Sequence, residues 1–199
     1  MIKAVIFDLG GVILKGKHFI KKGEKILGKT AVHNNDACFD RKLNLGTSSH
    51  RAAFERVFGK KLFDDEFIKL MKAWLSNWEM DEEMLELAKK LRRKYKIAIL
   101  SNTEQAYEEK YDNTLRKVFP VVVYSHKVRM LKPEKPIFEY TLKQLGVQPQ
   151  ESVMVDDVKE NCEAAKRLGM NCILFKNRQQ CERELKSLFA SQKALGKKE

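Results

Sequence analysis

The sequence predicts an α/β fold in which helices cover both faces of a parallel sheet and a helical unit is inserted near the N-terminus. Two observations predict it. Short, continuously apolar runs alternate with amphipathic stretches along most of the chain, and the alternation is interrupted between residues 15 and 80. Continuous apolar runs are typical of parallel strands that are buried on both faces. A chain of 199 residues can form one well-packed core and a small second unit.

The elements of the core follow one another in a regular order. The predicted strands lie at 2–7, 96–101, 121–124, 152–155 and 171–175. Helical stretches lie between them, at 81–95, 133–146 and 160–170. The first of these helices has acidic residues in its first turn and basic residues in its last, which complements the helix dipole. Strands that alternate with helices favour a doubly wound parallel sheet.

The segment that breaks this order shows helical patterns and no convincing strand. The patterns lie at 18–27, 48–58 and 64–78. We therefore expect a core of residues 1–14 and 81–199 and a helical cap of residues 15–80. Four aromatic residues fall near helical spacing in the cap, and we interpret them chiefly as packing within the cap or against the core. They are Phe63, Phe67, Trp74 and Trp78.

Charge and composition narrow the class of protein. The chain has 39 Lys and Arg residues against 27 Asp and Glu residues, a net charge of +12. Nucleic acids, acidic surfaces and anionic small molecules all favour a positive potential. No nucleic-acid-binding motif accompanies the charge, so nucleic acid is not expected as a partner. No segment approaches the ~20 apolar residues of a membrane helix, and Asp8 interrupts the apolar N-terminal run, which argues against a signal peptide.

The cysteines predict neither a zinc site nor a disulfide framework. They form no C-x-x-C pair and are scattered along the chain. We expect reduced thiols and a cytoplasmic protein. The four residues are Cys38, Cys162, Cys172 and Cys181.

Polar side chains gather where the predicted strands end. In open α/β sheets ligands bind beyond the carboxyl ends of the strands, so these side chains should meet at one edge. They comprise carboxylates, hydroxyl and amide donors and one cation, and the adjacent acidic pair could hold a hard metal ion. The set suits phosphoryl transfer. Its members are Asp8, Ser101, Asn102, Thr103, Lys132, Asp156 and Asp157.

Four segments around these residues resemble, in order, the motifs of the haloacid dehalogenase superfamily of hydrolases. The segments are FDLGGVI, ILSNT, LKPEKPIFE and VDDVKENCEAA, and together they span nearly the whole chain. The resemblance implies a three-layer α-β-α core of the Rossmann-like type with a parallel sheet. The helical insert after the first motif likewise resembles the cap that closes over the substrate in this family.

The resemblance also implies roles for single residues. Asp8 would be the nucleophile that attacks phosphorus and forms an aspartyl-phosphate, which water then hydrolyses. Ser101 and the amides around Asn102 would hold phosphoryl oxygens. Lys132 would neutralise charge on the phosphate and on Asp8.

A magnesium ion is the cofactor that the resemblance implies. Asp8, the backbone carbonyl of Gly10 and the acidic pair would hold it. Neighbouring residues at a strand end point in different directions, which favours Asp157 as the direct ligand and Asp156 as the residue behind it.

Gly10 departs from the family pattern. Many phosphatases of the superfamily have a second aspartate at this position, which protonates the leaving oxygen and later activates water. A general acid or base contributes ~10²- to 10⁴-fold, so its loss should slow the reaction without abolishing it. His18 lies close behind the first motif and could substitute, although a surface position is the favoured interpretation.

The sequence thus predicts a Mg²⁺-dependent phosphatase that acts on a small phosphorylated metabolite. Two alternatives stay open because of Gly10. One is a haloacid-type dehalogenase, since a halide leaves without a proton, although dehalogenation needs no metal. The other is a degenerate, non-catalytic member that binds a phosphorylated ligand or a partner protein.

Overall fold

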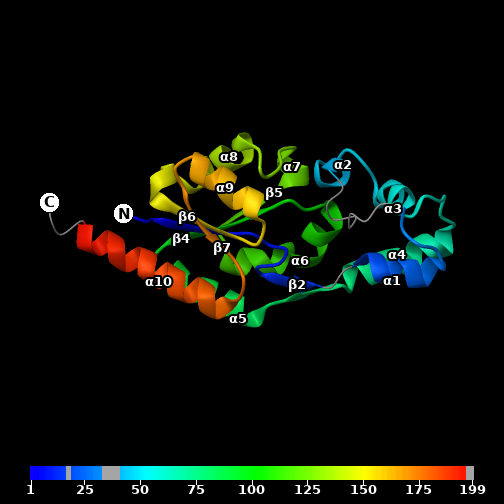
Figure 1. The fold of residues 1–199 in the computed structure, drawn as a ribbon, viewed down its shortest axis with the longest axis horizontal. Coiled ribbons are helices and arrows are strands. Elements are labelled where there is room, and N and C mark those ends of the chain that lie inside the picture. The colour runs from blue at the N-terminus through cyan, green and yellow to red at the C-terminus, as the bar shows by residue number, and fades with distance from the viewer. Residues whose placement is uncertain (17–18, 33–40, 196–199) are drawn as a thin grey trace.

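A five-stranded parallel sheet forms the centre of the molecule (Figure 1), in the strand order β5-β4-β1-β6-β7. The computed structural model describes residues 1–16, 19–32 and 41–195, and for residues 192–195 the backbone alone. The strands agree with the predicted ones to within two residues at each end. They are β1 (Ala4–Phe7), β4 (Lys96–Ser101), β5 (Val121–Tyr124), β6 (Ser152–Asp156) and β7 (Asn171–Leu174).

Successive residues of the strands enter two different hydrophobic cores. Val5, Phe7 and Ile99 pack in one core, whereas Ala4 and Ile6 pack in the other. The first core includes residues of α5 (Glu82–Arg92), α6 (Gln105–Val118) and α10 (Arg178–Leu195). The second includes residues of α8 (Lys135–Leu145) and α9 (Lys159–Arg167). Helices therefore cover both faces of the sheet, which confirms the predicted α/β class (Figure 1).

The register of the central strand brings three strand ends together. Phe7 of β1 pairs with Ile99 of β4 on one side and with Val155 of β6 on the other. The residues that follow these three positions therefore lie at the same edge of the sheet. Asp8 thus lies between the end of β4 and Asp156.

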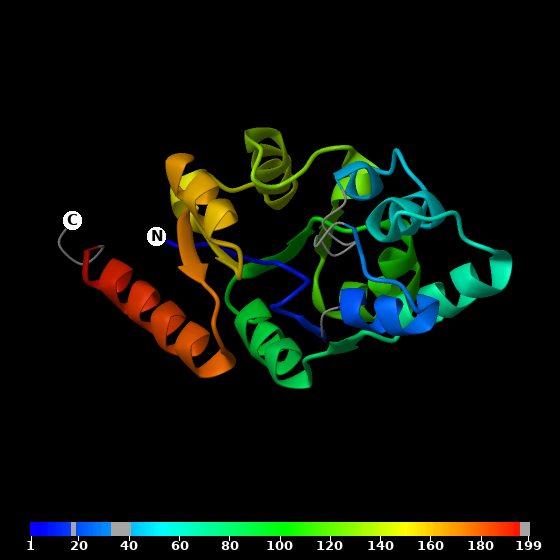
Figure 2. The same cartoon turned by 45° about the vertical axis from the view of Figure 1, so that its right-hand side comes forward.

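The helical insert lies beyond this edge, at the end of the molecule opposite the two termini (Figures 1 and 2). Aromatic rings fill its interior: the Phe19 and Trp74 centroids are 4.8 Å apart, and those of Phe19 and Phe54 are 5.2 Å apart. Its helices are α1 (Phe19–Leu27), α2 (Arg41–Asn44), α3 (His50–Phe58) and α4 (Asp64–Leu75).

The expectation of a strand-free insert is wrong. A small antiparallel sheet joins the insert to the core, formed by β2 (Leu14–Gly16) and β3 (Trp78–Met80). Each strand has only three residues, which is too short to show a period of two in the sequence.

The aromatic residues of the insert have different environments. Trp74 is fully buried, and its ring lies 5.4 Å from that of Tyr107 in the core, as expected for cap-to-core packing. Phe67 packs at the edge of the same core. The interpretation is wrong for Phe63, which is 74% exposed at the start of α4.

The expectation of reduced cysteines is wrong for one pair. Cys162 of α9 and Cys172 of β7 form a disulfide, with Cα atoms 5.4 Å apart. The two residues are 10 positions apart and become neighbours only when the helix packs beside the strand, so no short motif marks them. Cys181 is a buried free thiol, and Cys38 lies outside the described residues.

Two helices, α6 and α10, were not singled out from the sequence. The described part of the chain also contains two short elements, α7 (Ser125–Val128) and the 3-10 turn Pro149–Glu151. Among the helices described, none is long and apolar enough to cross a bilayer.

Candidate active site

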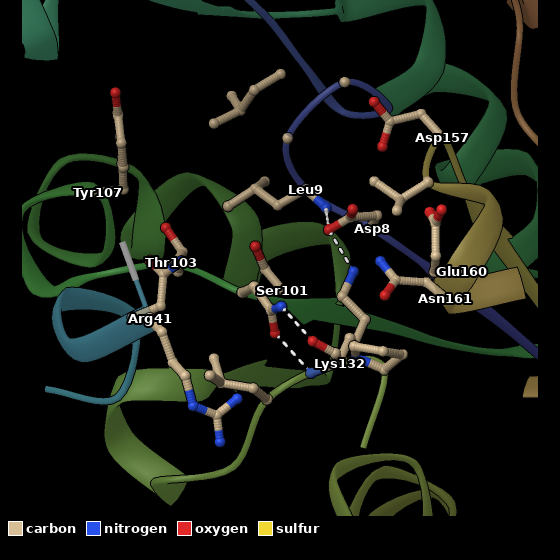
Figure 3. Close-up of a pocket in the computed structure, with 18 of the residues that line it drawn as sticks. Asp8, Leu9, Arg41, Ser101, Thr103, Tyr107, Lys132, Asp157, Glu160 and Asn161 are labelled. Atoms are coloured by element: carbon tan, nitrogen blue, oxygen red, sulfur yellow. Dashed lines mark hydrogen bonds and ion pairs between the residues drawn. The ribbon is translucent and has the colours of Figure 1, made fainter. Parts of the chain in front are cut away.

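A cavity of about 450 Å³ lies between the carboxyl edge of the sheet and the insert (Figure 3). It brings the predicted site residues together. Asp8 enters it from β1, Ser101 and Asn102 from β4, Lys132 from the loop before α8, and Asp157 from the loop after β6. Gly10 also lines the cavity, whereas Asp156 lies directly behind Lys132.

Lys132 connects two buried carboxylates. Its Nζ atom lies 2.8 Å from Asp8 Oδ1 and 2.7 Å from Asp156 Oδ2. Burial by itself lowers the pKa of Lys132, but Asp8 and Asp156 together raise that pKa above its ordinary value. Lys132 therefore stays a cation at the floor of the cavity.

Burial is the largest influence on the pKa of Asp8 and makes the carboxyl group a weaker acid. It raises the pKa of Asp8 from 3.8 to about 7, against the opposing charge of Lys132, and the neighbouring Asp156 contributes in the same direction as burial. A further positive charge beside Asp8 would favour its ionised, nucleophilic form.

The backbone and Lys132 fix the orientation of the Asp8 carboxylate. The amide of Asp8 donates to the carbonyl of Val155 over 2.9 Å, which extends the pairing of β1 with β6. The amide of Leu9 donates to Asp8 Oδ1 over 2.7 Å, and Lys132 binds the same oxygen. Both of these donors bind Oδ1, and neither binds Oδ2.

The two adjacent acids differ in their surroundings. Besides Lys132, Asp156 accepts hydrogen bonds from the backbone amide of Val158 (2.9 Å) and from Asn161 Nδ2 (3.0 Å). Asp157 lines the cavity and is exposed there. The surrounding protein still removes part of its hydration, and this partial desolvation and the nearby charge of Asp156 raise the pKa of Asp157. Ligand oxygens of Asp8, Asp156 and Asp157 lie within 4.8 Å of one another, so this group could hold a metal ion.

Asn102 connects the loop after β4 to the loop that carries Lys132. Asn102 Nδ2 donates to the carbonyl of Lys132, and the amide of Lys132 donates back to Asn102 Oδ1, both over 2.8 Å. The Asn102 side chain therefore positions Lys132, and the neighbouring Ser101 lines the cavity (Figure 3).

A buried acid that the sequence analysis missed connects this loop to the insert. Glu104 Oε1 accepts a hydrogen bond from Trp74 Nε1 over 3.0 Å, and Glu104 Oε2 lies 2.5 Å from His50 Nε2. The same carboxylate accepts from the amide of Ala106 at the start of α6. The sequence gives no signal for Glu104, because its two partners come from distant helices.

Other cavity residues also escaped the sequence analysis. Arg41, Asn44 and Trp78 enter from the insert and Tyr107 from the core, whereas Thr103, which follows Asn102, was expected at this edge of the sheet. Asn161 follows the acidic pair by one helical turn, a spacing that could have identified it. His18 lies outside the described residues.

Gly11 leaves room for Asp157, which yields a first prediction. Gly11 has φ +74°, and a Cβ atom there would lie 2.1 Å from Asp157 Oδ2. Gly11→Ala should therefore displace Asp157 and lower activity more than about tenfold, a loss typical of a disturbed metal ligand. Gly28→Ala is the matched control, because Gly28 has φ +60° and a Cβ atom there meets nothing within 4 Å. Equal activity of the two variants in phosphate-release assays would contradict this role.

Residues 5–175 match the family model described as haloacid dehalogenase-like hydrolase. The chain belongs to this family. The matched residues include both edge strands of the sheet, β5 and β7, and every residue that lines the cavity. They also include each of the four segments that suggested the family.

Named enzymes and solved structures resemble the chain along most of its length. The D-ribitol-5-phosphate phosphatase of Bacteroides thetaiotaomicron is 26% identical over 96% of this chain and 100% of its own. A family enzyme of the same bacterium, solved in complex with magnesium and inorganic phosphate, superposes with a TM-score of 0.72 at 25% identity, over 88% of this chain and 95% of its own. The L-2-haloacid dehalogenase of Xanthobacter autotrophicus shares the fold, with a TM-score of 0.65 at 20% identity over 94% of this chain and 83% of its own.

Proposed function

We propose that the chain is a Mg²⁺-dependent phosphatase that hydrolyses a small phosphorylated metabolite through an aspartyl-phosphate on Asp8. The observation that carries the proposal is the buried Asp8–Lys132–Asp156 group with Asp157 beside it at the cavity. Such a site combines a nucleophile, a cation for phosphoryl oxygens and carboxylates for a hard metal ion. The phosphatase relative and the relative that binds magnesium and phosphate support it.

Each residue of the site has a separate role in the proposed reaction. Asp8 Oδ2 attacks phosphorus, while Lys132 holds Asp8 in place and stabilises negative charge on the phosphoryl group. The Ser101 hydroxyl and the backbone amides near Asn102 bind phosphoryl oxygens. Asp8, the Gly10 carbonyl and Asp157 offer the oxygen ligands that suit Mg²⁺. When bound, the ion supplies positive charge at the phosphoryl oxygens and favours ionised Asp8.

The surroundings of the acidic pair predict which acid binds the metal. Asp156 is already bound by Lys132, Asn161 and a backbone amide, so we assign direct ligation to Asp157. Asp157→Asn should raise the Mg²⁺ concentration for half-maximal activity more than about tenfold. Asp156→Asn should chiefly lower stability, because it weakens the partner of a buried lysine. Magnesium titrations of phosphate release, with calorimetry of Mg²⁺ binding, check this, and the reverse order would exchange the two roles.

Gly10 predicts slow turnover of substrates whose leaving group needs a proton. A Cβ atom at Gly10 would lie 3.7 Å from the Trp78 ring, an ordinary contact, and the φ of Gly10 lies outside the left-handed region. The backbone and the space around a Cβ atom therefore allow a side chain to be introduced there.

Gly10→Asp should raise turnover of alkyl phosphates by roughly tenfold or more, and that of aryl phosphates much less. Gly10→Ala is the control, since it adds the Cβ atom without the carboxyl group. An unchanged ratio of the two rates in folded Gly10→Asp would mean that another residue already acts as the acid.

The dehalogenase alternative is favoured by the same glycine, since a halide leaves without a proton. One assay separates the alternatives: phosphorylated metabolites and 2-haloacids are supplied with Mg²⁺ or with EDTA, and phosphate and halide are measured. We expect phosphate release that EDTA removes. Halide release alone would establish the dehalogenase, and release of neither from any compound would favour a non-catalytic binding protein.

A further inference from the structure

The lining of the cavity includes a group of apolar and aromatic residues. The group consists of Leu14, Trp78, Tyr107 and Leu131, with Leu9 next to the nucleophile. The hydroxyl of Tyr107 donates to the backbone carbonyl of Trp74 over 3.2 Å. In the view of Figure 3, Tyr107 lies across the cavity from Asp157 and Glu160. The cavity therefore offers hydrocarbon surface as well as the charged groups that suit a phosphoryl group.

Two polar residues of α2 line the cavity, Arg41 and Asn44, and Arg41 is engaged elsewhere. Arg41 forms an ion pair with Glu134 over 2.7 Å, and its side chain is 65% exposed. Figure 3 shows its guanidinium group pointing away from Asp8. Arg41 is therefore not directed at Asp8, and Asn44 remains as a polar residue of the lining.

The Trp78 ring packs against two glycines, Gly10 and Gly16. A Cβ atom at Gly16 would lie 2.4 Å from Trp78 Cδ2, so the ring rests against bare backbone there. At Gly10 a Cβ atom would lie 3.7 Å from Cη2 and 3.8 Å from Cζ3. Residue 16 pairs with Trp78 across the small sheet, which fixes the ring over the loop that follows Asp8. The hydrocarbon edge of an indole thus borders the position from which an acidic side chain would reach the leaving oxygen.

We propose that the substrates of this site are aryl phosphate monoesters, whose aromatic ring packs against Trp78. The proposal rests on the proposed function and specifies its substrate class. An aryl oxide leaves with little help from a proton, and its flat ring matches an aromatic surface. Leu14 and Leu131 add apolar surface that gives the hydroxyl groups of a polyol phosphate no hydrogen-bond partner.

The reaction needs only Asp8, the aryl phosphate and water, and its bonds and protons balance. Asp8 Oδ2 forms a bond to phosphorus while the bond from phosphorus to the aryl oxygen breaks. The electron pair leaves with the aryl oxide, which takes its proton from solvent. Water then attacks phosphorus, so that the Asp8 carboxylate is restored and inorganic phosphate and a proton are released.

The test must separate ring shape from leaving-group acidity. Phenyl phosphate is therefore compared with a fluorinated alkyl phosphate whose alcohol is about as acidic as phenol. We expect kcat/KM to be roughly tenfold higher for phenyl phosphate in the wild type, the order of one good aromatic contact. Equal values would overturn the aryl assignment and leave the phosphatase proposal standing. Failure of both esters, and of acetyl phosphate, would overturn the phosphatase proposal as well.

Variants locate the preference at Trp78. Trp78→Leu and Gly16→Ala should bring the ratio of the two kcat/KM values close to one, the first by removing the ring and the second by displacing it. Trp78→Phe should keep most of the ratio. Phe63→Leu, which changes an exposed aromatic residue of the insert, should leave it as in the wild type. A wild-type ratio in folded Trp78→Leu would overturn the role of Trp78, and the wild-type comparison decides the substrate class should that variant not fold.

Discussion

Asp8→Asn is expected to abolish phosphate release, by roughly 10⁴-fold or more, while the fold persists. An amide oxygen is a poor nucleophile, and removal of a nucleophile that acts as one unit with its neighbours has effects of this order. The substitution changes no volume in the buried site, and Lys132 keeps its contact with Asp156. The loss is measured as the rate of phosphate release in the presence of Mg²⁺, monitored with a coupled assay and compared with that of the wild type.

The same variant should be more stable than the wild type when metal is removed. Burial raises the pKa of Asp8 from 3.8 to about 7, so the ionised carboxyl group is disfavoured in the folded state. The cost is absent below about pH 4, grows as the pH rises to about 7, and amounts to a few kcal/mol. Urea unfolding in EDTA should therefore show a gain for Asp8→Asn at pH 8 that disappears near pH 4. Wild-type turnover, or a stability difference that does not vary with pH, would contradict this account of Asp8.

Lys132→Met is expected to cause the largest loss of stability. The lysine is buried between Asp8 and Asp156, and its removal leaves two buried carboxylates without a cation. Breaking a buried ion pair from one side costs about 3–5 kcal/mol. Phosphate release should fall as well, by roughly 10³-fold, because charge on the phosphoryl group is no longer stabilised.

The loss of stability in Lys132→Met should become smaller as the pH falls, since protonated carboxyl groups need no cation. Lys135→Met is the matched control: Lys135 pairs with Glu139 over 2.9 Å, and its side chain is 65% exposed. Its free energy of unfolding should change by less than about 1 kcal/mol. Urea unfolding of both variants at pH 5 and pH 7 makes the comparison, and a loss in Lys132→Met no larger than in Lys135→Met would contradict the buried cation.

Most of the core and its site could be predicted because local signals and topology agree. The strands are continuous apolar runs, so their ends were visible in the sequence, and parallel pairing places those ends at one edge. Asp8, Ser101 and Asp156 follow from that rule alone. Lys132 follows from its place before a helix, although its contact with two carboxylates does not.

What the sequence could not predict depends on contacts between distant segments. Glu104 meets Trp74 and His50 only after the insert has packed on the core. Trp78 has the spacing of a core residue, and its place over Gly10 becomes visible only through the pairing of β2 with β3. Cys162 and Cys172 lie on a helix and a strand that pack together, so their spacing carries no signal.

Oxygen exchange into inorganic phosphate tests the central claim most directly, because it needs no knowledge of the substrate. A nucleophilic Asp8 forms its aspartyl-phosphate from inorganic phosphate and releases water, and hydrolysis then returns phosphate with an oxygen from the solvent. Phosphate labelled with oxygen-18 should therefore lose its label stepwise in the presence of the enzyme and Mg²⁺, and the loss should stop with EDTA or in Asp8→Asn. Retention of the label by the wild type with Mg²⁺, or equal loss in Asp8→Asn, would contradict the account.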